Sequence, residues 1–153
     1  MTTGPGKSHR QGLSLIDAVQ RFDTGARAEA WFIEQRWPSG PRCPFCASER
    51  IYQPPNRKPQ PYQCKACRKS FSPKTGTVMH GSKLPLSKWA IGIYLYSTHL
   101  KGVSSMKLHR DLGITQKSAW HMAHRIREMY DRNLPRFGGP AEADETYVGG
   151  RAG

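Results

Sequence analysis

Four cysteines arranged as two C-x-x-C pairs constrain this 153-residue chain more than any other feature. The pairs Cys43/Cys46 and Cys64/Cys67 each direct two sulfurs toward one point, and seventeen residues separate them. This spacing is typical of a closed tetrahedral four-sulfur zinc site. The link between the pairs contains "QPPNRKPQP", which cannot form a helix, and "RIYQ" and "PYQC" at its two ends predict short strands. We therefore expect a small β-type zinc ribbon over residues 38–76, folded by its metal.

Other uses of the four thiols are less favoured by the pattern. Disulfides are uncommon inside cells, and buried free thiols or a redox dithiol explain two matched pairs poorly. Iron remains an open alternative, because soft thiolate ligands suit iron as well as zinc. A four-sulfur site leaves no open coordination position, so the expected metal is structural.

The charge of the chain predicts a polyanionic partner. The net charge is +13, and Arg50–Arg110 contains twelve Lys or Arg residues and no acid. A stretch whose charges are all positive could be a solvated face or a disordered tail. This stretch is rich in aromatic and aliphatic residues, so it should fold. We therefore expect nucleic-acid binding. The sequence has no apolar run of transmembrane length and no secretory signal, which predicts a cytoplasmic, nucleoid-associated protein without a membrane partner.

Helical patterns flank the cysteine pairs on both sides. We expect two helices over 14–37, the second capped by Thr24, after a disordered lead-in at 1–13. The pattern of residues 77–133 predicts three helices, with Gly113 in a tight turn before the last, which is typical of a helix-turn-helix. We expect Pro85 in the first turn of the first of these helices and Thr115 as the cap of the last. A linker at 134–140 and a strand in 141–153 would follow.

The last of these helices has one polar, basic face and one apolar stripe, formed by Ala119, Met122, Ala123 and Ile126. If this helix enters a major groove, its first residues lie near base edges and later ones near phosphate. The alternative is a basic helix that packs only within its own domain. A metal site at His121 and His124 is disfavoured because no third ligand lies nearby in the sequence. The predicted DNA contacts are Gln116, Lys117, His121 and Arg125, with Lys107 and Arg110 on the preceding helix.

Four motifs, in order, resemble a known family. They are "WPSGPRCPFC", "CKACRKSFSPKTGTVMHGSKLPLSKW", "KGVSSMKLHRDLGITQKSAWHMAHRIRE" and "ADETYVGG". Together they resemble bacterial insertion-sequence transposases of the zinc-ribbon type (the ISXO-two-like group), over about residues 14–150. The resemblance implies a zinc ribbon, then an all-α segment that recognises terminal inverted repeats in double-stranded DNA, then a ribonuclease-H-like α/β catalytic domain. Self-association on paired ends is a further implication.

The resemblance also assigns a role to one acid near the end of the sequence. Asp144 in "DETYVGG" matches the first of three catalytic ligands that hold Mg²⁺ or Mn²⁺ for DNA strand cleavage and transfer. Its neighbour Glu145 should face the opposite side of a strand. Because the other two ligands do not follow, we expect a stub of the catalytic domain and a catalytically incomplete chain.

Three functions stay open on the sequence alone. The chain could be the DNA-binding N-terminal portion of a transposase, or one part of an active enzyme completed from a downstream reading frame. It could also be a zinc-ribbon protein that binds nucleic acid or protein partners without specificity for transposon ends.

Overall fold

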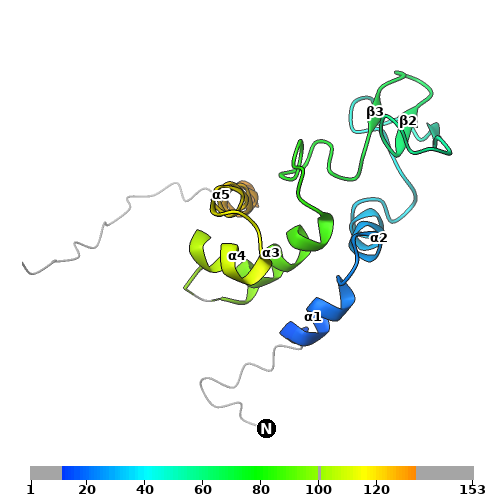
Figure 1. Cartoon of the computed structure of the whole chain (residues 1–153). Helices are drawn as coiled ribbons and strands as arrows, with labels where there is room; N and C mark the ends of the chain where they lie inside the picture. The colour runs from blue at the N-terminus through cyan, green and yellow to red at the C-terminus, as the bar shows by residue number, and fades with distance from the viewer. Residues whose placement is uncertain (1–11, 100, 134–153) are drawn as a thin grey trace, which may run out of the picture.

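The computed structural model describes residues 12–99 and 101–133 (Figure 1). Within these residues, two helices come first, followed by a three-stranded sheet and then by three more helices. The predicted linker at 134–140 and the predicted strand with Asp144 lie outside the described residues. The elements are α1 (Leu15–Arg21), α2 (Gly25–Arg36), β1 (Ile51–Tyr52), β2 (Tyr62–Cys64), β3 (Ser70–Phe71), α3 (Leu86–Thr98), α4 (Ser105–Leu112) and α5 (Gln116–Asn133).

Short polar side chains start four of the helices. Thr24 accepts a hydrogen bond from the N–H of Arg27 at 3.3 Å, which confirms the predicted cap of α2. Ser104 and Thr115 do the same for α4 and α5, at 3.1 and 3.2 Å. These bonds satisfy amides that the first turn of a helix leaves without partners. Pro85, predicted in the first turn of α3, is instead its N-cap residue, and the helix begins at Leu86.

Helices α3, α4 and α5 pack around one apolar core, here called the helical core. Gly113 ends α4 in the left-handed conformation (φ 61°, ψ 37°), and α5 begins three residues later. Lys88 of α3 donates to the carbonyl of Leu112 at 2.5 Å, which satisfies one free acceptor at the end of α4. The predicted three helices and their tight turn are therefore confirmed. The core includes Trp89, Leu108, Leu112, Ala119, Met122 and Ile126.

A glycine allows the close approach of α3 and α5. A Cβ atom at Gly92 would lie 2.7 Å from the sulfur of Met122, which is closer than packed atoms normally come. Gly92 therefore lets the two helices meet without a side chain between them.

The ribbon is a small antiparallel sheet with strand order β1-β2-β3. Ile51 pairs with Cys64, and Tyr62 pairs with Phe71. Strands at β1 and β2 were predicted from the sequence, whereas β3 was not. Trp37, Tyr62 and Phe71 pack against one another and against the buried cysteines, with ring centroids 5.5–5.9 Å apart. This ribbon core is small, as expected for a segment that needs a metal to fold.

Helix α2 belongs to both cores and lies between the ribbon and α3 (Figure 1). Its Ala28, Trp31 and Phe32 pack into the helical core. Its Ile33 and the following Trp37 pack into the ribbon core. The ribbon is thus attached to the helices through one rigid element in addition to the chain that joins them.

The segment between β3 and α3 is held by a side chain of α2 and by one of its own. Arg36 donates to the carbonyl of Pro73 at 2.8 Å, and Lys74 donates to Ser82 and Leu84 at 3.1 and 2.7 Å. Burial lowers the pKa of both Arg36 and Lys74. The two cations therefore serve as structural donors to backbone carbonyls, which reduces the positive charge that is free for a partner.

Candidate metal centre and nucleic-acid interface

The two cysteine pairs form turns with the same backbone conformation. The N–H of Cys43 donates to the carbonyl of Ser48, and the N–H of Cys64 donates to Lys69, both at 3.0 Å. The residue after each second cysteine is left-handed, with φ of 59° at Ala47 and 61° at Arg68. This conformation is uncommon for residues other than glycine and here reverses the chain so that both sulfurs of each pair face inward.

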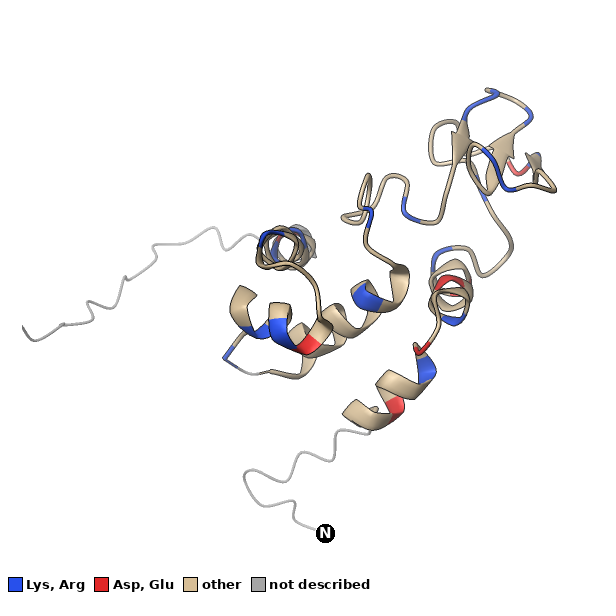
Figure 2. Cartoon of the chain, viewed as in Figure 1, with Lys and Arg blue, Asp and Glu red and all other residues tan. Residues whose placement is uncertain are grey.

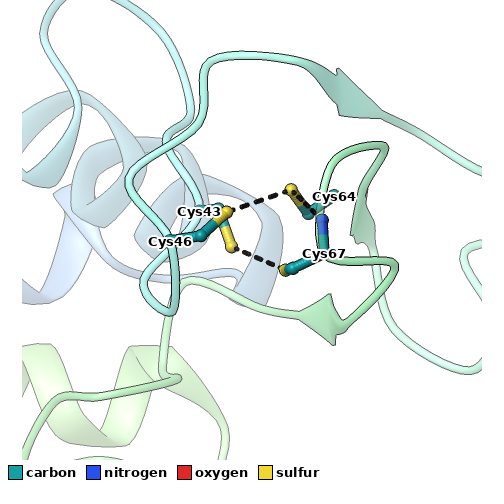
Figure 3. Close-up of side chains that lie close together, drawn as sticks. All are labelled: Cys43, Cys46, Cys64 and Cys67. Carbon is teal, nitrogen blue, oxygen red and sulfur yellow. Dashed lines mark hydrogen bonds between the residues drawn. The ribbon is translucent and has the colours of Figure 1, made fainter.

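The sulfurs of Cys43, Cys46, Cys64 and Cys67 all lie within 4.8 Å of one another (Figure 3). Backbone N–H groups also point at them: Phe45 donates to Cys43 at 3.4 Å and Cys67 donates to Cys64 at 3.5 Å. Such bonds stabilise thiolates and orient them. Four convergent sulfurs without a fifth ligand are the donor set of a closed, tetrahedral zinc site. The chain can therefore bind a structural zinc ion at this point.

The pKa values of two of the thiols, Cys64 and Cys46, are shifted in opposite directions. The N–H of Cys67, helped by that of Ala66, lowers the pKa of Cys64 to about 6. At Cys46 the N–H of Ser48 favours the thiolate, but desolvation and hydrogen bonds shared with the other sulfurs outweigh it and raise the pKa to about 12. Zinc binds thiolates, so binding near neutral pH must release the proton of Cys46. Zinc affinity should therefore fall as the pH is lowered.

The comparisons with known proteins agree with this geometry. Residues 24–70, which include α2, β1, β2 and the first residue of β3, match the family described as transposase zinc-ribbon domain. A protein in the transposable element ISH50 of Halobacterium salinarum is 30% identical over 131 residues, or 85% of this chain. Both similarities relate this chain to insertion-sequence transposases with an N-terminal zinc ribbon.

The chain spans 44% of the length of this Halobacterium relative. No solved structure matches it significantly.

The family description favours zinc over iron in the four-cysteine site. Among the described residues no helix is long and apolar enough to cross a membrane. No second group of three or more potential metal ligands occurs in this part of the chain, so His121 and His124 gain no further ligand there.

The structure places the predicted DNA contacts on two neighbouring helices. Lys117 and His121 are exposed on α5. Gln116 donates to the hydroxyl of Ser105 at 3.2 Å, which joins the starts of α5 and α4. On α4, Arg110 is exposed, and Lys107 pairs with Asp111 at 2.8 Å. These residues therefore lie near the two helix starts, and their contact with DNA stays a prediction.

Arg125 has a structural role that its sequence position did not reveal. Its Nη1 donates to the carbonyls of Val78 at 2.9 Å and His80 at 2.5 Å, so it ties α5 to the segment before α3. A cavity of about 320 Å³ lies beside it, lined in part by Lys83, Ser118 and His121. The rest of its lining includes the apolar side chains of Leu84 and Met122. Arg125 thus fixes one wall of this cavity.

Trp120 is the residue that sequence reasoning missed. Its side chain is 52% exposed on α5, and its ring centroid lies 4.1 Å from that of His124. The predicted stripe of Ala119, Met122, Ala123 and Ile126 is buried, which leaves Trp120 on the opposite side of the helix. Counting helical positions from this stripe would have placed Trp120 outside the core. A large exposed ring here is a candidate contact for a partner.

Proposed function

We propose that the described part of this chain is the DNA-binding portion of a transposase and that α5 reads the terminal inverted repeats of its element. This proposal rests on the residues that α5 exposes on its outward face. It presents Lys117, Trp120 and His121 to solvent while the opposite stripe fills the helical core. A helix in this position, preceded by a short helix and a tight turn, can enter the major groove of duplex DNA.

Each exposed group on α5 suits a different part of a duplex. Gln116 and His121 can form hydrogen bonds with base edges, and the Trp120 ring can contact the methyl group of thymine. Lys117 adds charge that releases counterions from the phosphate backbone. The cavity beside Arg125, with Lys83 and Ser118, suits a phosphate that fixes the position of the helix along the groove.

The role of Asp144 is proposed only for a protein that also holds the other two ligands. The relative from Halobacterium is more than twice as long as the matched segment, and its remaining length leaves room for them. In such a protein, Asp144 would hold Mg²⁺ or Mn²⁺ with two further carboxylate or amide ligands, and the ions would activate a scissile phosphate. The 153-residue chain by itself is proposed to bind DNA without cleaving it.

Replacing Lys117 with alanine tests the DNA-facing role of α5. We expect weaker binding to duplex DNA and a plot of log affinity against log salt concentration whose slope is smaller by about 1, because one fewer phosphate is neutralised. Fluorescence anisotropy of a labelled element-end duplex at several salt concentrations measures both quantities.

Arg21→Ala is the matched control for charge. Arg21 is an exposed residue of α1, which lies apart from α5 (Figure 1), and its loss removes the same single charge. The control should leave the salt slope nearly unchanged. Equal slopes for the Lys117 and Arg21 variants would show that α5 is not the DNA-contacting face.

A further inference from the structure

Two large aromatic side chains of the ribbon lie outside its core. Phe45 is 50% exposed in the first cysteine turn, and Tyr52 is 44% exposed in β1. Tyr52 follows Ile51, which packs against the ribbon core, so the two residues face opposite sides of the strand. Burial in the fold therefore does not explain why these two positions carry rings.

Each of these rings lies beside a lysine of the second cysteine turn. The Nζ atom of Lys69 is 4.8 Å from the centroid of Phe45, and that of Lys65 is 5.9 Å from the centroid of Tyr52. The backbone N–H of Lys65 also donates to the carbonyl of Arg50 at 2.8 Å. Since both lysines flank Cys67, the metal site fixes the turn from which they project. We call Phe45, Tyr52, Lys65 and Lys69 the ribbon patch.

The surroundings of the ribbon patch are positively charged. Arg68 lies between its two lysines and is exposed, and Arg50 precedes β1. In Figure 2 Lys and Arg segments occur on several loops of the ribbon, at the end of the molecule away from α5. Glu49, an acid near this surface, forms an ion pair with Arg42. The surface therefore attracts polyanions and is separate from the face proposed to hold duplex DNA.

Exposed rings combined with ammonium groups suit unpaired nucleotides. A flat ring can stack on any base whose face is accessible, while nearby lysines contact the phosphates. In an intact duplex the base faces are covered by their neighbours, so the rings would reach little beyond sugar and phosphate. An acidic peptide would satisfy the lysines but would leave both rings without a stacking partner. Single-stranded DNA satisfies both kinds of group.

We propose that the ribbon patch binds single-stranded DNA by stacking unpaired bases on Phe45 and Tyr52. This inference rests on the proposed function, because it adds a second DNA site to the duplex site on α5. A DNA end whose strands are partly separated would contact both sites, with its duplex on α5 and its free strand on the ribbon.

Binding of the zinc-loaded full chain to oligodeoxythymidine tests this proposal. Phe45→Leu and Tyr52→Leu keep an apolar side chain and remove the ring, and each should weaken binding by about tenfold, the effect expected for the loss of one stacked base. Neither change should alter affinity for a blunt duplex. Tyr52→Phe keeps the ring and should bind like the unchanged chain. Val19→Ala, at a residue of α1 that is also 50% exposed, controls for loss of apolar surface.

A second readout separates stacking from charge. The base analogue 2-aminopurine, placed in the single strand, should lose fluorescence when the chain binds and should keep it with the Phe45→Leu/Tyr52→Leu double variant. Unchanged oligodeoxythymidine affinity in that double variant, with zinc still bound, would overturn the proposal. Tenfold tighter binding of oligouridine than of oligodeoxythymidine would also overturn it, since the site would then be one for RNA.

The duplex experiment on Lys117 is independent of this result. If the Lys117 variant loses duplex affinity while the ribbon variants bind single strands normally, the ribbon inference fails and the proposed function stands. If Lys117 and Arg21 variants behave alike while the ribbon variants lose single-strand binding, the assignment of α5 fails and the ribbon site stands.

Discussion

Replacing Cys64 with serine is expected to unfold the ribbon and to leave the helical core folded. Cys64 is 1% exposed, and its sulfur lies 3.6 Å from that of Cys46. Structural zinc contributes on the order of 10–16 kcal/mol to small zinc-folded peptides, and a site with three sulfurs retains only part of this. The ribbon core around Trp37, Tyr62 and Phe71 is too small to compensate. The helical core has its own buried residues and needs no metal.

Amide hydrogen exchange measures this outcome residue by residue. Protection should be lost from β1 to β3 and retained in α3 and α5. Ala66→Ser is the control, because it introduces the same residue at an exposed position of the same turn and should change nothing. A loss of protection in the ribbon and in all three C-terminal helices together would show that the two cores fold as one unit.

The second large effect is expected from Trp89→Ala in the helical core. Trp89 is 1% exposed, and its indole N–H donates to the hydroxyl of Ser82 at 3.0 Å. Removing a buried tryptophan side chain typically lowers the free energy of unfolding by about 3–5 kcal/mol, through lost burial and the cavity left behind. The variant should therefore lose much of the stability of α3, α4 and α5, while zinc keeps the ribbon folded.

Urea unfolding followed by far-ultraviolet circular dichroism measures the loss, because helices dominate that signal in this chain. Trp89→Phe keeps most of the buried ring and loses the bond to Ser82, so it should lower stability much less than the alanine variant. Equal losses for both variants would indicate that the hydrogen bond, not the buried area, stabilises the core. Loss of bound zinc from the alanine variant before urea is added would contradict the separation of the two cores.

The sequence predicted those features that depend on short-range chemistry. The spacing of Cys43, Cys46, Cys64 and Cys67 predicted a four-sulfur site, and the sulfurs converge in the structure. Thr24 and Thr115 predicted helix starts, because a capping oxygen acts on amides two or three residues away. The turn at Gly113 was also predictable, since glycine adopts the left-handed conformation without strain.

Features that depend on distant packing were not predictable in this way. The apolar residues of α2 indicated a buried face but not that this face divides between two cores. The basic face of α5 included Arg125, yet the carbonyls of Val78 and His80, to which it donates, are over forty residues away in the chain. Strand β3 has two residues and exists through its pairing with β2, so local pattern carries little signal for it.

Competition between two duplexes tests the central claim most directly. A labelled duplex carrying the terminal inverted repeat of the element is bound to the zinc-loaded chain, and unlabelled repeat or a shuffled duplex of equal length and composition is added at physiological salt. We expect the shuffled duplex to need at least about tenfold higher concentration to displace the label, because each mismatched base pair costs roughly 1–3 kcal/mol. Displacement by both duplexes at the same concentration would contradict recognition of transposon ends and would leave the chain a general DNA-binding protein.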